Sequence, residues 1–415
     1  HADLTVQRLH QGWSEQHPSD WVAAVDKTLR KLAASHPSDM ARVQGIGLSG
    51  HMHGATLLDA DGMVLRPCMM WNDTRAHQEA SELDAIPAFR ALTGNIVFPG
   101  FTAPKVLWVA RNEPDTFARC AKILLPKDYL RYWLTGVYAS EMSDAAGTSW
   151  LDVAQRDWSD TLLSETGLTR DHMPNLVEGS AVSGTVLPDL AASWGIQATP
   201  VVAGGAGDNA ATAIGAGIVQ SGQGFVSLGT SGVLFAATDA YRAKPETAVH
   251  AFCHALPDRW HHMGVILSAA DALNWHARIM GRSAPDLVAD LGGNLLAPTS
   301  VRFLPYLSGE RTPHNDAHVR GSFHGLSHDT TAAHMTQAVL EGVAFALCDT
   351  QAALEYIGSQ ITTLIAMGGG SNSDYWLSLI ATVLECDVLR PTDGDFGASF
   401  GAARLGLMAH TGANA

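Results

Sequence analysis

The hydrophobic pattern along the chain switches repeatedly between a helical and a strand-like period. Between residues 20 and 34, apolar residues recur at helical spacing, which predicts an amphipathic helix with Trp21, Val25, Leu29 and Leu32 on one face. Residues 43–48 are strand-like, and Asp61-Gly62 predicts a hairpin turn a little further on. Because strand and helix signals continue to alternate, the chain is predicted to be an α/β protein.

A glycine-rich segment at residues 204–211, GGAGDNAA, places one carboxylate, Asp208, among small residues. The apolar run 201–203 before it predicts a buried strand, and residues 210–214 after it are typical of a helix. Negative charge is favoured at a helix N-terminus, and glycines let a ligand approach closely. We therefore predict that Asp208 is a general base. The alternative is that Asp208 only caps the helix.

Two further glycine elements follow. Gly229, Thr230 and Ser231 lie between the β-prone arms 225–228 and 233–237, which predicts a hairpin whose tip offers N–H groups and hydroxyls to a phosphate. The alternative is a simple tight hairpin. Gly368, Gly369 and Gly370 lie between a strand-like run, 361–367, and an amphipathic helix that contains Trp376. This arrangement predicts backbone packed against a nucleotide.

Composition narrows the function classes. The 415 residues are 46% hydrophobic and 16% charged, which is enough for two cores and predicts two domains. The net charge of −15 and the lack of a Lys/Arg cluster argue against nucleic acid or an anionic membrane as partner. The long apolar run 201–219 is interrupted by Asp208, so no membrane span is predicted. Five scattered cysteines predict reduced thiols and a cytoplasmic location, and the 19 histidines lack the partners of a structural zinc site.

The order of base, phosphate hairpin and nucleotide loop resembles the actin-like ATPases, in particular the FGGY family of carbohydrate kinases. Residues 100–112, GFTAPKVLWVARN, resemble the N-terminal signature of the family, and residues 321–341, GSFHGLSHDTTAAHMTQAVLE, resemble its C-terminal signature. The resemblance implies two ribonuclease-H-like domains flanking a cleft. The glycine-rich stretch 215–224 would separate a sugar-binding domain, 1–220, from a nucleotide-binding domain, 221–415.

Within the family, residues 50–55, 71–75 and 303–314 look most like the members that phosphorylate xylulose. The resemblance then implies ATP-dependent phosphorylation of D-xylulose on O5, with Asp208 as the base and Mg²⁺ as the metal. The residues implied on the sugar side are Met52, His53, Trp71 and Asn209. Those implied on the ATP side are Gly229, Thr230, Ser231, Gly368, Gly369, Gly370 and Asn372.

Several alternatives stay open. His53 and Trp71 would instead be packing residues, as would Lys105 and Trp108 of the first signature, and Asp73 and Arg75 would form either an ion pair beside the sugar or a solvated turn. A kinase for ribulose, gluconate or another polyol is the second enzyme reading, and a non-catalytic sugar-binding actin-like protein is the third. The pair Met52-His53 argues against glycerol kinase, where Arg-Glu is expected.

Two departures from the family pattern affect these expectations. His51 stands where the xylulose-phosphorylating members usually carry Gln, so the fine sugar selectivity is open. The Asp-Leu-Gly-Thr-Ser type hairpin, whose aspartate helps to hold the metal in the family, is not found. We therefore expect the chain to be a trimmed piece of a longer protein, with its main Mg²⁺ ligand in the absent segment. The expected partners are the sugar and ATP, and a homodimer is a further candidate.

Overall fold

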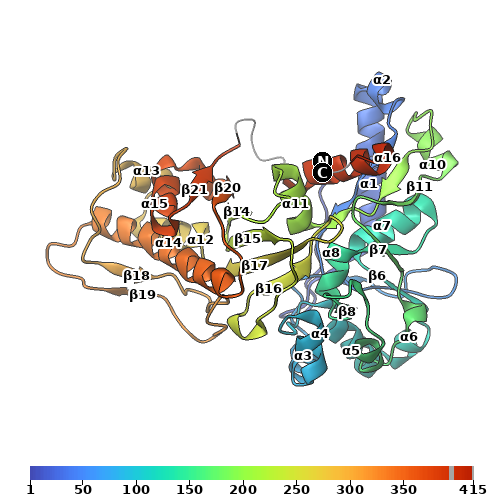
Figure 1. Ribbon diagram of the computed structural model, residues 1–415, viewed down its shortest axis with the longest axis horizontal. Coiled ribbons are helices and arrows are strands. Elements are labelled where there is room, and N and C mark those ends of the chain that lie inside the picture. The colour runs from blue at the N-terminus through green and yellow to red at the C-terminus, as the bar shows by residue number, and fades with distance from the viewer. Residues whose placement is uncertain (392–396, 414–415) are drawn as a thin grey trace. The chain divides into compact units, whose positions relative to one another are not determined.

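The computed structural model describes residues 1–391 and 397–413, which divide into two compact units (Figure 1). The first unit contains His1–Gly217, the short segment Phe252–Arg259 and the C-terminal helix α16 (Gly397–Thr411). The second unit contains Ile218–Ala251 and the chain from Trp260 to the strand β21 (Asp387–Leu389). Helices and strands alternate in both units, which confirms the predicted α/β class.

The first unit is built from short strands and many helices. Its strands are β1 (Glu15–Gln16), β2 (Gly45–Ile46), β3 (Ser49–Gly50), β4 (Thr56–Leu58), β5 (Cys68–Met69), β6 (Lys122–Leu124), β7 (Ala139–Glu141), β8 (Leu151–Asp152), β9 (Asp157–Trp158), β10 (Asn175–Val177), β11 (Val182–Thr185), β12 (Val201–Ala203) and β13 (Ala206–Gly207). Its helices before α16 are α1 (Pro18–Ser35), α2 (Pro37–Met40), α3 (His77–Asp84), α4 (Pro87–Thr93), α5 (Thr102–Asn112), α6 (Pro114–Ala118), α7 (Pro126–Thr135), α8 (Met142–Ala145), α9 (Asp160–Ser164), α10 (Pro188–Ser193) and α11 (Asp208–Ala216). The predicted helix 20–34 is confirmed by α1, and the predicted turn by the hydrogen bond from Gly62 N to Asp59 O (3.0 Å).

Two pairs of parallel strands join distant segments of the first unit. Strand β12 lies between β11 and β2, and pairs with β2 in parallel. Further along, β13 pairs with β3, also in parallel, so that Gly207 lies opposite Gly50. Because paired parallel strands run in the same direction, the residues that follow β3 and those that follow β13 lie at the same end of the pair.

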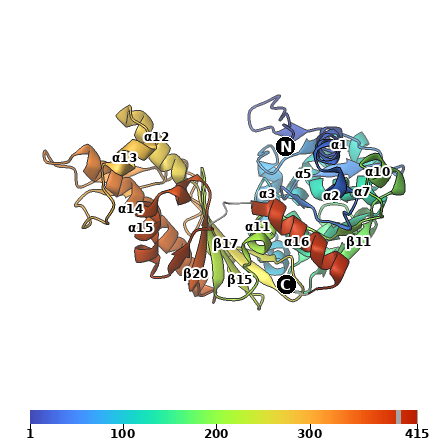
Figure 2. The same ribbon diagram turned by 90° about the horizontal axis from the view of Figure 1, so that it is seen from above.

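The C-terminal helix α16 packs within the first unit, whereas the predicted boundary placed it with residues 221–415. Figures 1 and 2 show it beside α11. Glycines of α16 make these contacts: a side chain at Gly401 would collide with the carbonyl of Ala211 in α11, and one at Gly406 would approach Gly47 N, which lies between β2 and β3, to 2.8 Å. Without a Cβ at these positions, backbone packs on backbone, which is the close approach that glycine allows.

The second unit is organised around one sheet and a long helix. Its strands are β14 (Gln223–Leu228), β15 (Gly232–Thr238), β16 (His250–Cys253), β17 (Trp260–Ile266), β18 (Arg302–Leu304), β19 (Ser322–His324), β20 (Thr363–Met367) and β21. Its helices are α12 (Ala270–Met280), α13 (Ala284–Ala289), α14 (Ala332–Tyr356) and α15 (Asp374–Leu384). Among the described residues the sheet has six strands, in the order β16-β17-β15-β14-β20-β21, where β16 ends within the segment assigned to the first unit.

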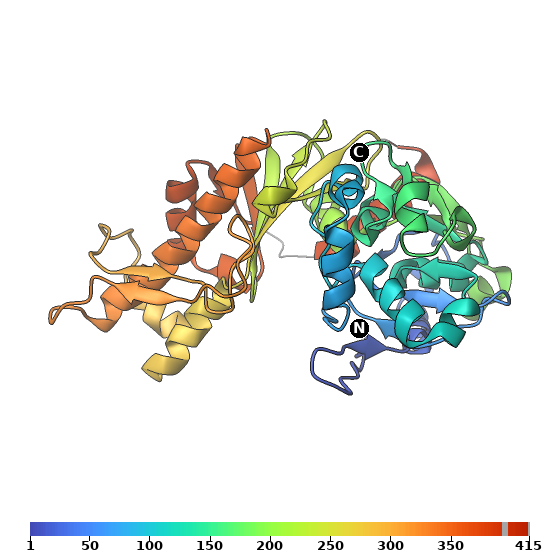
Figure 3. The same cartoon turned by 90° about the horizontal axis from the view of Figure 1, so that it is seen from below.

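The long helix α14 begins at a capping box. The Thr331 hydroxyl accepts the His334 amide and the Thr331 amide donates to the His334 ring, both at 3.3 Å, which satisfies two groups of the first turn. Figure 3 shows this helix, in orange, running beside α15, and the Trp376 indole of α15 donates to the Leu340 carbonyl of α14 (3.3 Å). His334 therefore has a structural role in the C-terminal signature.

Candidate active site

Asp208 lies where the parallel pair β3 and β13 ends. Because Ser49 and Gly50 of β3 pair with Ala206 and Gly207 of β13, Asp208 follows one strand while Met52 and His53 follow the other. A side chain at Gly207 would lie only 3.0 Å from the Cγ of Met52. Of the predicted sugar-side residues, Met52 thus lies against the residue before the predicted base, and His53 and Asn209 directly follow Met52 and Asp208 in the chain.

Asp208 is a solvent-accessible residue in the first turn of α11. The N-cap residue of α11 is Gly207, and Asp208 occupies the first helical position. Asn209 donates twice to Oδ1 of Asp208, from its amide N (2.9 Å) and from Nδ2 (3.2 Å). Desolvation by the surrounding protein raises the pKa of Asp208, and the hydrogen bonds from Asn209 oppose this shift. A raised pKa makes a carboxylate a stronger proton acceptor at neutral pH.

His53 is held in an unusual backbone conformation. Its φ is 69°, in the left-handed region that non-glycine residues rarely adopt, and such strain is concentrated at functional sites. Its Nδ1 lies 2.7 Å from the Gly147 carbonyl, and its ring stacks on Phe101 with 4.4 Å between centroids. Because a carbonyl only accepts, Nδ1 carries the proton, and in the neutral ring Nε2 is an acceptor. A purely packing role would require neither the strain nor the fixed tautomer.

Residues of the N-terminal signature hold the backbone of His53. Lys105 is fully buried on α5 and donates to the carbonyl of His53 (2.9 Å), and the Thr102 hydroxyl donates to the same carbonyl (3.2 Å). Burial lowers the pKa of Lys105 to about 7. Trp108 of the same helix lies 5.1 Å from the guanidinium of Arg75. These signature residues therefore carry structural contacts, and Lys105 positions the backbone of His53.

The other first-unit candidates occupy different surroundings. Trp71 is 56% exposed, so its core-burial alternative is wrong, and its carbonyl lies against Gly100, next to Phe101. Asp73 and Arg75 form the ion pair (2.6 Å), and both are buried, so the solvated-turn alternative is wrong.

His51, the residue that departs from the family pattern, lies beside Trp21. It lines a cavity of 460 Å³ together with Trp21 and Lys127, and its ring lies 6.1 Å from that of Trp21. Burial lowers the pKa of His51 to about 4, and the nearby Lys105 adds to the shift, so the ring is neutral at pH 7. Nothing in this placement brings His51 to Asp208.

In the second unit, the two glycine elements meet at one end of the sheet. Strands β14 and β20 are parallel, with Ser227 opposite Met367, so the hairpin turn and the triple glycine both follow directly after paired residues. Gly368 packs on the turn: a Cβ there would lie 3.3 Å from Gly229 N. The hairpin itself is confirmed by the pairing of Leu228 with Gly232.

Backbone amides at the start of α12 hold the hairpin turn by hydrogen bonds. Ala270 N donates to the Gly229 carbonyl (2.8 Å) and Ala269 N to the Thr230 carbonyl (2.9 Å). The turn of Gly229, Thr230 and Ser231 is therefore more constrained than a simple hairpin tip.

Within the glycine loop, the second glycine is the open position. Gly368 has φ +79°, whereas a Cβ at Gly369 would meet no atom within 4 Å. Asn372, at the end of the short 3₁₀ helix η4 (Gly369–Asn372), is exposed. Backbone that is open on one side and ordered on the other suits the approach of a planar or anionic ligand.

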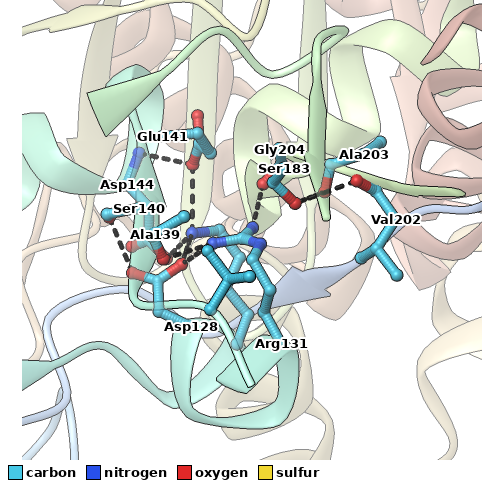
Figure 4. A network of polar contacts seen from close by, with 12 residues as sticks. Asp128, Arg131, Ala139, Ser140, Glu141, Asp144, Ser183, Val202, Ala203 and Gly204 are labelled. Carbon is cyan, nitrogen blue, oxygen red and sulfur yellow. Dashed lines mark hydrogen bonds and ion pairs between the residues drawn. The ribbon is translucent and has the colours of Figure 1, made fainter. Parts of the chain in front are cut away.

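A buried cluster of charges below the Asp208 loop was not predicted. Lys127 Nζ lies 2.8, 3.3 and 3.0 Å from the carboxylates of Asp128, Glu141 and Asp144, and all four side chains are fully buried. Arg131 pairs with Asp128 at 2.7 Å (Figure 4). Burial raises the pKa of Asp144 to about 8, although Lys127 opposes the shift. The i,i+3 pair Asp128 and Arg131 was the available sequence signal, but such pairs are usually exposed.

Neither a metal site nor a membrane helix is found in the part of the chain that the structure describes. Within residues 1–391 and 397–413, no group of three His, Cys, Asp or Glu side chains is placed to hold a metal ion. None of the helices described there is both long and apolar enough to cross a membrane. The ligands of the expected Mg²⁺ ion therefore stay unassigned.

Comparison with known proteins places these features in a family. Residues 1–215 match the N-terminal domain, and residues 224–410 the C-terminal domain, of the FGGY family of carbohydrate kinases. The chain belongs to this family and is an enzyme that phosphorylates a carbohydrate. Over 408 residues it is 50% identical to the xylulose kinase of Escherichia coli (strain K12), an alignment that covers 98% of this chain and 84% of that protein.

Solved structures agree with the fold. A "xyloylose kinase" from Brucella ovis is 62% identical, with a TM-score of 0.99 over 100% of this chain and 86% of that one. The xylulose kinase from Rhodospirillum rubrum is 28% identical, with a TM-score of 0.92 over 99% and 85% of the two chains. A glycerol kinase from Plasmodium falciparum, 18% identical with a TM-score of 0.91, shares the fold. The predicted family and its two-domain actin-like fold are thus confirmed.

Proposed function

We propose that this protein transfers the γ-phosphoryl group of ATP to O5 of D-xylulose, giving D-xylulose 5-phosphate. The observation that supports the proposal is the parallel pairing of β3 with β13, because Asp208 follows one strand of this pair while Met52 and His53 follow the other. The 50% identity to a xylulose kinase supports the choice of sugar. A non-catalytic sugar-binding protein would not need a carboxylate of raised pKa at this position.

Each candidate residue of the first unit is assigned a separate role. Asp208 accepts the proton of the sugar hydroxyl as it attacks phosphorus, and Asn209 keeps one carboxylate oxygen, Oδ1, in a fixed direction. His53 presents Nε2 as an acceptor to a sugar hydroxyl, and Met52 lines the apolar side. Trp71, which is exposed, offers a ring face to the carbon side of the sugar.

In the second unit, backbone groups serve the nucleotide. The turn of Gly229, Thr230 and Ser231 contacts the phosphates, and the loop from Gly368 to Asn372 packs on the nucleoside part of ATP. The absence of a Cβ contact at Gly369 leaves room for that approach. Mg²⁺ accompanies ATP and neutralises phosphate charge. The described residues provide no set of three ligands for it, and none of the roles above depends on the metal.

A rate panel tests the choice of sugar. The full chain is assayed with ATP and D-xylulose, D-ribulose, L-ribulose, gluconate and glycerol, and the products are identified by mass spectrometry. We expect the highest kcat/KM for D-xylulose. A higher kcat/KM for ribulose or gluconate would replace the proposed substrate within the same family, and binding of sugar without turnover of any of them would indicate the non-catalytic alternative.

A further inference from the structure

The loop of residues 204–207 carries Asp208 and is held by two side chains of the neighbouring elements. Arg131 of α7 donates through Nη2 to the carbonyl of Gly204, at the start of the loop. The hydroxyl of Ser143, in α8, accepts the amide of Gly207, the residue directly before Asp208 (3.0 Å). Both anchoring groups are fully buried, so water does not compete for these bonds.

The anchors are fixed by the buried charge cluster. The Ser143 hydroxyl donates to Oε2 of Glu141 (2.8 Å), and Glu141 is in turn paired with Lys127 (3.3 Å). Arg131 Nη1 donates to Asp128 (2.7 Å) and to the Ala139 carbonyl (2.6 Å), as Figure 4 shows. Because the hydroxyl proton of Ser143 is committed to Glu141, its oxygen is left as an acceptor that points at Gly207.

Stability alone is a weak reason for such a cluster. Desolvating several charges costs about as much free energy as their attraction returns, and well-packed apolar residues of similar size often stabilise a fold equally well. The cluster provides what apolar residues lack, namely directed hydrogen bonds to a loop that is rich in glycine and would otherwise have much conformational freedom. Two of its contacts, from Arg131 to the Gly204 carbonyl and through Ser143 to the Gly207 amide, end on the loop that carries the base.

We infer that Ser143, oriented by Glu141 and Lys127, is a positioning residue that fixes the amide of Gly207 and thereby the direction of the Asp208 carboxylate. This inference rests on the proposed role of Asp208 as the base. In this assignment Ser143 acts through the Gly207 amide and not by contact with the substrate. Misplacement of a catalytic group by about 1 Å lowers turnover by about 100-fold, so the loss of this one bond is measurable.

The test compares Ser143→Ala with Ser183→Ala. Ser183 is a matched control because its hydroxyl is also buried in the first unit and bonds to the carbonyls of Val202 (2.9 Å) and Ala203 (3.1 Å), in the strand before the loop. We expect Ser143→Ala to lower kcat for D-xylulose by about 10- to 100-fold with little change in either KM. Ser183→Ala should change kcat by less than about twofold, since the loop keeps both anchors.

A double variant separates positioning from general damage. If Ser143 acts through Asp208, Asp208→Asn/Ser143→Ala should be no slower than Asp208→Asn alone, because residues that act as a unit are not additive. A full additional loss in the double variant, or equal losses in Ser143→Ala and Ser183→Ala, would overturn the inference.

Hydrogen exchange provides a readout that does not depend on activity. In the peptide that spans residues 204–209, Ser143→Ala should accelerate amide exchange at least tenfold over the wild type, whereas Ser183→Ala should not. If the protein phosphorylates none of the sugars in the panel, the proposed function fails, yet the exchange experiment still decides whether Ser143 holds the loop. Unchanged exchange in Ser143→Ala would show that it does not.

Discussion

The candidate functional groups of the two units differ in kind. In the first unit, the candidate groups are side chains, Asp208 and His53, whose backbones are fixed by buried polar residues such as Ser143 and Lys105. In the second unit they are mainly backbone groups at Gly229 and Gly368, brought together by parallel strands. A base must point in one direction, which requires a supporting shell, whereas a phosphate is bound by N–H groups that need only close approach.

This difference predicts how each site fails. Side-chain changes in the first unit should affect turnover and sugar affinity, and added side chains at the glycines of the second unit should affect ATP.

Asp208→Asn should have the largest effect, a fall in kcat of about 10²- to 10⁴-fold, because the amide cannot accept the hydroxyl proton. Steady-state kinetics with D-xylulose and ATP measure it, and near-ultraviolet circular dichroism checks that the fold is kept. In the wild type, kcat/KM should fall as the pH drops through the pKa of Asp208, which lies above the usual aspartate value. A variant that keeps this acidic limb, or turns over at the wild-type rate, would exclude Asp208 as the base.

Lys127→Met should have the next largest effect, on stability. It leaves the buried carboxylates of Asp128, Glu141 and Asp144 without their shared cation, so we expect a loss of about 3–5 kcal/mol in the free energy of unfolding. Lys122→Met is the matched control, because Lys122 Nζ donates to the backbone carbonyls of Asp171 (2.6 Å) and Met173 (3.3 Å) and lies over the Tyr138 ring (5.7 Å to its centroid), and the loss of these contacts should cost about 1 kcal/mol.

The free energy of unfolding of both lysine variants is measured by urea unfolding at pH 7 and pH 9. Burial raises the pKa of Asp144 and Lys127 opposes this shift, so in Lys127→Met the pKa of Asp144 rises further. The proton that Asp144 then binds in the folded variant relieves part of the repulsion among the carboxylates, and this relief is lost as the pH rises. The variant should therefore lose more stability at pH 9 than at pH 7. Equal stability of the two variants would mean that the cluster contributes nothing net.

Much of this arrangement could be predicted from local sequence, because it depends on neighbouring residues. The strand before Asp208, the helix after it and the hairpin around Thr230 each follow from an apolar run next to a glycine turn, and the structure contains all three. The conjunction of Asp208 with His53 required the family resemblance, since the β3 and β13 pairing joins residues more than 150 positions apart.

Two features could not be predicted because they depend on tertiary contact. The packing of α16 on α11 is set by Gly401 against Ala211, and a glycine in a helical run gives no sign of its partner. Lysine and glutamate side chains are usually exposed, and only the fold shows that Lys127 and Glu141 are fully buried and paired. For the same reason Lys105 was assigned no partner, although it is the support of His53.

His53→Ala should have a smaller effect, confined to the sugar. Removing an acceptor and its stacking on Phe101 should raise KM for D-xylulose by the equivalent of about 1–3 kcal/mol, with KM for ATP changed much less. His51→Ala is the control two residues away, since His51 faces Trp21 and the 460 Å³ cavity. If both variants raise the two KM values alike, His53 acts through folding and not through sugar contact.

The smallest effect should come from Gly369→Ala, which tests the backbone groups of the second unit. A Cβ at Gly369 meets no protein atom within 4 Å, so the variant should be as stable as the wild type, yet the methyl group stands where a nucleotide would approach. We expect ATP to bind roughly 3- to 10-fold more weakly by calorimetry, equivalent to about 1 kcal/mol, with sugar affinity unchanged.

Gly368→Ala provides the contrast that makes the Gly369 result interpretable. At φ +79°, with Leu228 backbone atoms 3.1 Å from the added Cβ, this change strains the loop itself and should cost about 1–3 kcal/mol of stability. Weaker ATP binding together with lost stability at Gly368, but without it at Gly369, would separate a loop that shapes the site from a residue that faces the ligand. Unaltered ATP affinity in Gly369→Ala would remove this glycine from the nucleotide site, and the second unit would then bind ATP through the hairpin turn alone.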